Sequence, residues 1–198
     1  MRISLGLSVL ALRAQGAVVP AIPAPLIPGY ASIATFGDSI TVGLNSSPQA
    51  TASWAALLRS AIGTGTLLNQ GISGTVLQNS PDSGGSARAN NGRDRFLAAL
   101  LGANKRDAVF VAYGFNDARY TAASASFNVA SYASDYRELL TGLIIGGYAP
   151  ADIYVGAPYY ITDAGLATGS TGFTGQTRAG FEAFVAAALS VAEEFGTN

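Results

Sequence analysis

Three residues far apart along the chain carry groups that could act together on a carbonyl carbon: Ser39, Gly71 and Asn116. The Ser39 hydroxyl could attack the carbon. The backbone N–H groups of Ser39 and Gly71 and the side-chain amide of Asn116 could donate hydrogen bonds to the carbonyl oxygen, which becomes negatively charged in the tetrahedral intermediate. Together these groups predict an acyl-transfer site, provided that the fold brings them to one place.

Each of the three residues also has an ordinary structural explanation. A serine after Gly37 and Asp38 commonly caps a helix or satisfies a turn, and Asn116 beside Asp117 commonly forms a turn. Gly71 could serve a left-handed backbone position. Only the joint arrangement of the three favours a chemical role, so the elements that position them decide the interpretation.

Four short apolar runs predict β-strands: residues 32–36, 66–69, 108–113 and 153–157. Continuous apolar runs suit strands that are covered on both faces, as in a parallel sheet. The three candidate residues follow the ends of the first three runs. Because ligands bind beyond the carboxyl ends of the strands in open parallel sheets, the three segments are predicted to share one rim of the sheet.

Helical patterns alternate with these runs: residues 54–62, 93–101, 132–144 and 176–195. Apolar residues recur in each pattern at spacings of three and four, which places them on one helix face. Alternating strands and helices predict an α/β domain whose parallel sheet carries helices on both sides. Residues 79–92 are rich in Ser, Gly and Asn and predict a flexible loop on the same rim as the candidate site.

The composition excludes several classes of partner. A chain of 198 residues suits one domain, and 11 Lys and Arg against 12 Asp and Glu leave a net charge of −1, which provides no basic surface for nucleic acid or an anionic membrane. The chain contains no Cys and no His. Thiolate metal sites and the commonest metal ligand are therefore excluded, and no metal or other cofactor is predicted.

The N-terminal part of the chain carries weaker signals. Residues 1–29 are expected to form an extension or a signal-like segment followed by a proline-rich linker, and residues 30–198 to form the folded domain. A signal-like segment would favour secretion and a frayed extension would not, so the compartment and the oligomeric state stay open. The uncharged stretch of residues 14–37 contains four prolines and cannot run as one membrane helix, so no membrane span is expected.

Three segments resemble, in the same order, the first three sequence blocks of the GDSL or SGNH hydrolases. They are Gly37-Asp38-Ser39-Ile40, Asn69-Gln70-Gly71-Ile72-Ser73-Gly74 and Gly114-Phe115-Asn116-Asp117. The resemblance implies a three-layer α/β/α sandwich, similar to flavodoxin-like folds, that hydrolyses small-molecule or carbohydrate esters. Ser39 would be the nucleophile, and Gly71 and Asn116 would complete the oxyanion hole. Asp38 and Asp117 would order the surrounding loops.

The chain departs from the family pattern at the fourth block, an Asp-x-x-His motif that supplies the general base. No His is present, and loss of a triad member typically costs about 10⁴ to 10⁶ in turnover. The pattern therefore predicts an incomplete chain, without a last strand and helix of on the order of 30 to 50 residues in all, that is nearly inactive as it stands. The alternative is a non-catalytic module that binds a glycan or an acylated ligand in the same cleft.

Neither a substitute base nor another ligand class fits the sequence well. Asp38 and Asp117, with an ordinary carboxyl pKa of about 4, would be weak bases for a hydroxyl. Lys105 precedes the third strand and is expected at the opposite end of the sheet. A phosphate- or nucleotide-binding domain would depend on glycines such as Gly63 and Gly71, which match no phosphate-loop or dinucleotide fingerprint.

Overall fold

The computed structural model describes residues 29–81, 85–119, 126–167 and 176–198. The signal-like segment and nearly all of the linker predicted for residues 1–29 lie outside the described residues. None of the helices in the described ranges is long and apolar enough to cross a membrane.

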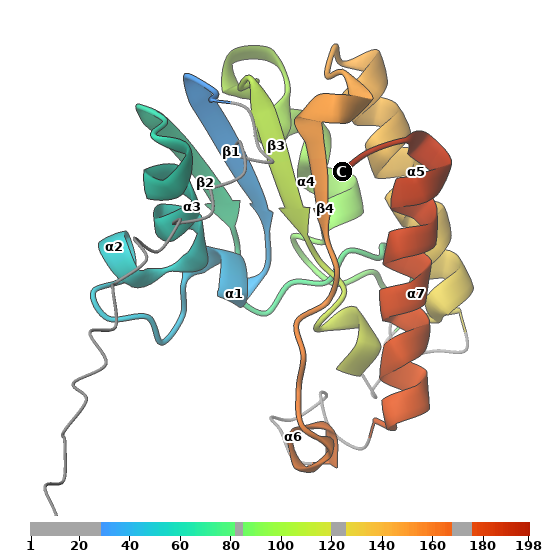
Figure 1. The fold of residues 1–198 in the computed structure, drawn as a ribbon. Coiled ribbons are helices and arrows are strands. Elements are labelled where there is room, and N and C mark those ends of the chain that lie inside the picture. Colours follow the sequence, from blue (N-terminus) through green and yellow to red (C-terminus); the bar gives the residue numbers. More distant parts are fainter. Residues whose placement is uncertain (1–28, 82–84, 120–125, 168–175) are drawn as a thin grey trace, which may run out of the picture.

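Four parallel strands form the sheet at the centre of the molecule (Figure 1). They are β1 (Ser32–Gly37), β2 (Thr66–Gly71), β3 (Ala108–Ala112) and β4 (Ile153–Gly156), in the order β2-β1-β3-β4. The four strands and their parallel arrangement confirm the sequence-based prediction. β2 extends two residues further than predicted and includes Gly71 itself.

Burial on both faces explains why β3 is apolar along its whole length. In β3, the neighbours Val109 and Val111 belong to one hydrophobic cluster, whereas Ala108 and Phe110 belong to another. Successive strand residues point to opposite faces of a sheet, so the two clusters lie on opposite sides. All four side chains are buried, which is the pattern expected for a strand between two helical layers.

Helices cover both faces of the sheet and complete three layers (Figure 1). α3 (Trp54–Ile62) packs on one face, where it contributes to the smaller cluster. α4 (Gly92–Leu100), α5 (Val129–Ile145) and α7 (Arg178–Phe195) bury their apolar side chains in the larger cluster on the other face. The structure thus confirms the predicted α/β fold with helices on both sides of a parallel sheet.

Several short elements were not predicted from the sequence. They are α1 (Ser39–Val42), α2 (Gln49–Ala52), α6 (Asp163–Ala167), and the 3₁₀ turns η1 (Gly102–Asn104), η2 (Asp117–Arg119) and η3 (Pro150–Asp152). Elements of three to five residues are too short to show a hydrophobic periodicity. α1 begins at Ser39, the predicted nucleophile.

The outer edge of β4 pairs with the last residue of the chain. The Asn198 N–H donates to the Ile153 carbonyl at 3.0 Å, and the Val155 N–H donates to the Asn198 carbonyl at 2.8 Å. These two bonds follow the pattern of a parallel ladder, in which one residue bonds to residues i and i+2 of its neighbour.

Candidate active site

The three candidate segments leave the sheet side by side. Gly37 at the end of β1 is paired with Gly71 at the end of β2 and with Ala112 at the end of β3. In Figure 1 the arrowheads of these strands point to the same edge, where α1 begins. The sheet order thus brings together segments that lie more than 30 residues apart in the sequence.

Ser39 is positioned by the tight turn that follows β1. It is the first residue of α1, and the Asp38 carboxylate caps this helix by accepting a hydrogen bond from the Ile40 N–H at 2.9 Å. Ser39 is half-buried, and none of the hydrogen bonds found among the described residues involves its hydroxyl. The Ser39 hydroxyl is therefore available to a ligand, whereas Asp38 is occupied as a helix cap.

Gly71 packs closely against the backbone of α1. A Cβ atom at this position would come within 2.5 Å of the Val42 backbone nitrogen, so only glycine permits this contact between β2 and α1. The Gly71 N–H donates to Asn69 Oδ1 at 2.9 Å, and Asn69 Nδ2 donates to the Thr41 carbonyl at 2.7 Å. Gly71 is thus close to the Ser39 turn, but its N–H already has a partner.

Asn116 follows β3 and is bound to the segment after β2. Its Nδ2 atom donates to the Thr75 carbonyl at 2.9 Å, and the residue is only 7% exposed. A side-chain amide carries two N–H donors, and the Thr75 carbonyl uses one of them. The second donor is left for a ligand at the rim.

Gly74 is a further backbone donor in this segment that sequence reasoning did not select. It has a left-handed φ of +76°, is exposed, and no heavy atom lies within 4 Å of where its Cβ would be. No hydrogen bond to its N–H is found within the described ranges. It also immediately precedes Thr75, whose carbonyl binds Asn116. Its place in the same block as Gly71 was the only available signal.

Asp117 holds the segment after β2 through hydrogen bonds. Its carboxylate accepts hydrogen bonds from the backbone N–H groups of Leu77, at 2.9 Å, and Gln78, at 3.1 Å, and from Gln78 Nε2 at 3.3 Å. Burial raises the pKa of Asp117 to about 6, although these hydrogen bonds act to lower it. The arrangement supports the expectation that Asp117 orders a loop beside the site.

The pKa of Asp38 is raised by burial, like that of Asp117. Burial raises the pKa of its carboxyl to about 6, opposed by the Ile40 N–H and reinforced by the negative charge of Asp117. Tyr159, after β4, has a pKa raised to about 12, mainly by burial and also by the charge of Asp38. The segment after β4 therefore also approaches the turn that carries Ser39.

Lys105 lies at the amino end of the sheet, as predicted. It precedes β3, and its ammonium group lies 4.6 Å from the centroid of the Tyr148 ring. Within the described residues, no cluster of three or more Asp, Glu, His or Cys side chains could hold a metal ion.

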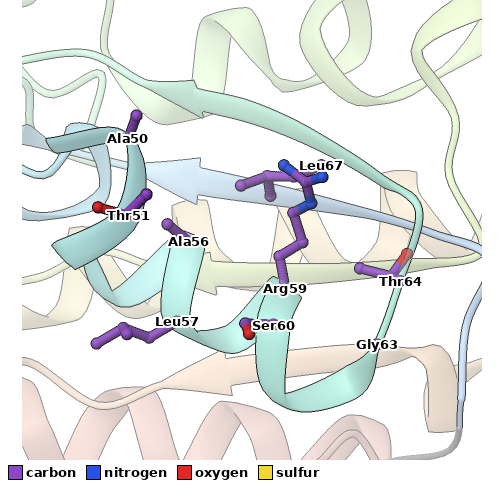
Figure 2. Close-up of a pocket in the computed structure, with 9 residues that line it drawn as sticks. All are labelled: Ala50, Thr51, Ala56, Leu57, Arg59, Ser60, Gly63, Thr64 and Leu67. Carbon is purple, nitrogen blue, oxygen red and sulfur yellow. The ribbon is translucent and has the colours of Figure 1, made fainter. Parts of the chain in front are cut away.

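Figure 2 shows a separate hollow of about 460 Å³ between α2, α3 and β2. It is lined by Ala50, Thr51, Ala56, Leu57, Arg59, Ser60, Gly63, Thr64 and Leu67. Arg59 extends toward Leu67 in this view. The lining contains none of the three candidate residues, so this hollow is distinct from the rim that carries them.

Known structures share this architecture at low sequence identity. Est24, a carbohydrate acetylesterase from Sinorhizobium meliloti, is 21% identical with a TM-score of 0.61, and the match covers 84% of this chain and 81% of that chain. A carbohydrate acetylesterase family member from the same organism is 15% identical with a TM-score of 0.61, and the match covers 84% of this chain and 80% of that chain. The lipase/acylhydrolase from Enterococcus faecalis is 20% identical with a TM-score of 0.54, and the match covers 84% of this chain and 73% of that chain. At these identities the likeness shows the fold alone.

Sequence comparison supplies the family. No curated protein matches the chain. The sequence model of the GDSL-like Lipase/Acylhydrolase family matches residues 35–198, which include the strand ends that carry Ser39, Gly71 and Asn116. The chain therefore belongs to the GDSL-like Lipase/Acylhydrolase family.

Proposed function

We propose that this chain hydrolyses carboxylic esters with Ser39 as the nucleophile. The observation that carries the proposal is the adjacency of the ends of β1, β2 and β3. At the first end, the Ser39 hydroxyl has no partner among the described residues, and at the third, the Asn116 amide uses one of its two N–H donors on the Thr75 carbonyl. An attacking oxygen and oxyanion donors are the two requirements of acyl transfer. The other members of the site are backbone groups and structural carboxylates.

In the proposed reaction, Ser39 Oγ bonds to the ester carbonyl carbon and the alcohol leaves as the tetrahedral intermediate collapses. Water then attacks the acyl-serine and releases the carboxylic acid. The Ser39 N–H and the free N–H of the Asn116 amide would stabilise the oxyanion in both steps. Each step also needs a group that takes a proton from the attacking oxygen and returns one to the leaving oxygen.

Two backbone N–H groups, at the end of β2 and in the segment after it, are candidates for the third oxyanion donor. Gly71 could donate only after releasing Asn69 Oδ1, to which its N–H is bound at 2.9 Å. Gly74 requires no such change, because its N–H has no partner among the residues described and its left-handed backbone is open to the outside. We therefore assign the third donor to Gly74 and regard Gly71 as the glycine that admits α1.

The proposed substrates are small-molecule or carbohydrate esters. Two of the structural neighbours are named as carbohydrate acetylesterases, which favours an O-acetyl group as the first acyl group to test. The chain contains no His, so an unassisted Ser39 should turn over slowly, by about 10⁴ to 10⁶ less than with a complete triad.

Imidazole rescue tests the proposal on the chain as it exists. Hydrolysis of p-nitrophenyl acetate is measured against imidazole concentration for the wild type and for Ser39→Ala, and the variant's rate is subtracted as background. Bound imidazole would take the Ser39 proton and return it to the leaving alcohol, a contribution of about 10² to 10⁴ for general base catalysis. The expected result is a saturable, Ser39-dependent rate and an acetyl group on the Ser39 peptide in acid-quenched samples.

Identical rates in the wild type and Ser39→Ala at every imidazole concentration would refute the nucleophile. If acetylated ligands then bound to the wild type without turnover, the result would favour the non-catalytic binding module instead. Circular dichroism and the melting temperature of both proteins exclude unfolding as the cause, since the Ser39 hydroxyl makes no hydrogen bond within the described structure that its removal would break.

A further inference from the structure

Arg95 in α4 reaches the ends of three strands at once. Its Nη1 donates to the Gln70 carbonyl of β2 at 2.9 Å, and its Nη2 donates to the Gly37 carbonyl of β1 at 3.0 Å. Nη2 also donates to the hydroxyl of Tyr113, the residue directly after β3. One side chain thus joins the three strands whose following segments carry Ser39, Gly74 and Asn116.

A short relay connects Arg95 to the Asn116 amide. The Tyr113 hydroxyl lies 3.2 Å from Thr75 Oγ1, which donates to the Ile72 carbonyl at 2.7 Å. The backbone carbonyl of the same Thr75 accepts the hydrogen bond from Asn116 Nδ2. A change at Arg95 would therefore be transmitted through two side chains to the position of Thr75, and with it to Asn116.

The environment of Arg95 differs from that of the surface arginines. Arg93, Arg137 and Arg178 form ion pairs with carboxylates, whereas the ion pairs found in the described residues do not include Arg95. Its guanidinium instead lies over the Phe36 ring, 4.1 Å from the centroid, and its buried Nε has no hydrogen-bond partner in the described part of the chain. A half-buried cation held only by neutral groups pays a desolvation cost, and the three strand contacts provide its compensation.

We propose that Arg95 is a positioning residue that holds the three segments of the active site in register. The planar fork of its guanidinium satisfies two carbonyls and a hydroxyl at fixed angles, which a lysine ammonium on a flexible stem cannot reproduce. Arg95 is not proposed to touch the substrate. It acts through Gly37, Gln70 and Tyr113 on the residues that follow them, so the inference rests on the proposed function for its catalytic consequence.

The test compares Arg95→Lys and Arg95→Met with Arg93→Met, a matched control two residues away on the same helix whose ion pairs lie on the surface. Hydrogen exchange by mass spectrometry reports the local effect. Exchange should accelerate about 10-fold or more in peptides covering residues 37–42, 71–78 and 113–118 in both Arg95 variants, while α7 keeps its protection. Arg93→Met should match the wild type in all of these peptides.

The imidazole-dependent, Ser39-dependent ester hydrolysis supplies the second readout, at a temperature where every variant is folded. Displacement of a donor by about 1 Å can cost about 10²-fold, so kcat should fall about 10- to 100-fold in both Arg95 variants while KM changes little. Arg95→Lys should not restore kcat, because a lysine ammonium cannot reproduce the guanidinium hydrogen bonds that position the strand ends.

The outcomes separate the two claims. Local deprotection with a wild type that shows no Ser39-dependent hydrolysis would refute the proposed function and leave the positioning role standing. A uniform rise in exchange over the whole chain, unchanged exchange at the rim, or full recovery in Arg95→Lys would overturn the positioning role, because simple packing or charge would then explain Arg95.

Discussion

Asp38 and Asp117 are buried carboxyls next in sequence to Ser39 and Asn116, the side chains that we assign to catalysis. Burial raises the pKa of each to about 6, compared with about 3.9 in an unfolded chain. Between these values the folded protein binds protons that the unfolded chain has already released. The contribution of both groups to the free energy of unfolding is therefore largest at about pH 4 and falls as the pH rises to about 6.

Asp38→Asn should remove one of these groups and keep the helix cap, because an asparagine Oδ1 can also accept the Ile40 N–H. Relative to the wild type, the variant should gain up to about 3 kcal/mol in the free energy of unfolding as the pH rises from about 4 to about 7. Urea denaturation across this range measures the difference. Asp163→Asn, which alters an exposed ion pair with Arg178, is the control. A difference between Asp38→Asn and the wild type that stays constant with pH would contradict the burial argument.

Asn116 should contribute to the rate more than to the stability. Removing one oxyanion donor typically costs about 10²- to 10³-fold in kcat, so Asn116→Ala should lower the imidazole-dependent rate by that factor. Asn104→Ala is the matched control, because Asn104 also donates its amide to a backbone carbonyl, that of Ala98, but at the surface. Equal rates in the two variants would remove Asn116 from the oxyanion hole.

At the scale of elements, the contact of β2 with α1 depends on the absence of a side chain at Gly71. Gly71→Ala would place a Cβ 2.5 Å from the Val42 nitrogen, and the shift needed should cost about 1 to 3 kcal/mol in the free energy of unfolding. It should also displace Ser39 and lower the rescued rate. Thermal and urea unfolding measure the first effect.

Gly65→Ala, one residue before β2, is the control for that substitution. The atom nearest to its added Cβ would be the Ala31 carbonyl oxygen at 3.8 Å, so this change should be neutral or stabilise the protein by about 0.4 to 1 kcal/mol. If both alanine variants were equally stable, the close approach of α1 to β2 would be wrong.

The strands and the long helices could be predicted from the sequence, whereas the short helices and 3₁₀ turns could not. β3 and α5 have strong periodic or continuous apolar patterns because their burial is regular. The predicted strand ended at residue 69, before the end of β2, because the two residues that follow are the polar Gln70 and the glycine Gly71. α1 carries no hydrophobic pattern, since its formation depends on the Asp38 cap and on the packing against Gly71.

At the scale of the whole molecule, the sheet order brings the candidate site residues to one edge of the sheet. Nothing in the local pattern specifies that β1 lies between β2 and β3, yet this order places Gly37 beside both Gly71 and Ala112. Sequence reasoning selected Ser39 and Asn116 as candidates from the residue types that follow the strands. It could not find Arg95, because an arginine on an amphipathic helix has the signature of a solvent-exposed residue until the tertiary contacts are known.

The most direct test of the common site is a crystal structure of the chain after reaction with an alkyl phosphonate ester in the presence of imidazole. The phosphonyl oxygen on a modified serine stands in for the oxyanion of the tetrahedral intermediate. We predict an adduct on Ser39 whose oxygen lies about 2.7 to 3.1 Å from the Ser39 nitrogen and from Asn116 Nδ2. An adduct on another residue, or a Ser39 adduct whose oxygen points away from Asn116, would contradict the assignment of the three strand ends to one active site.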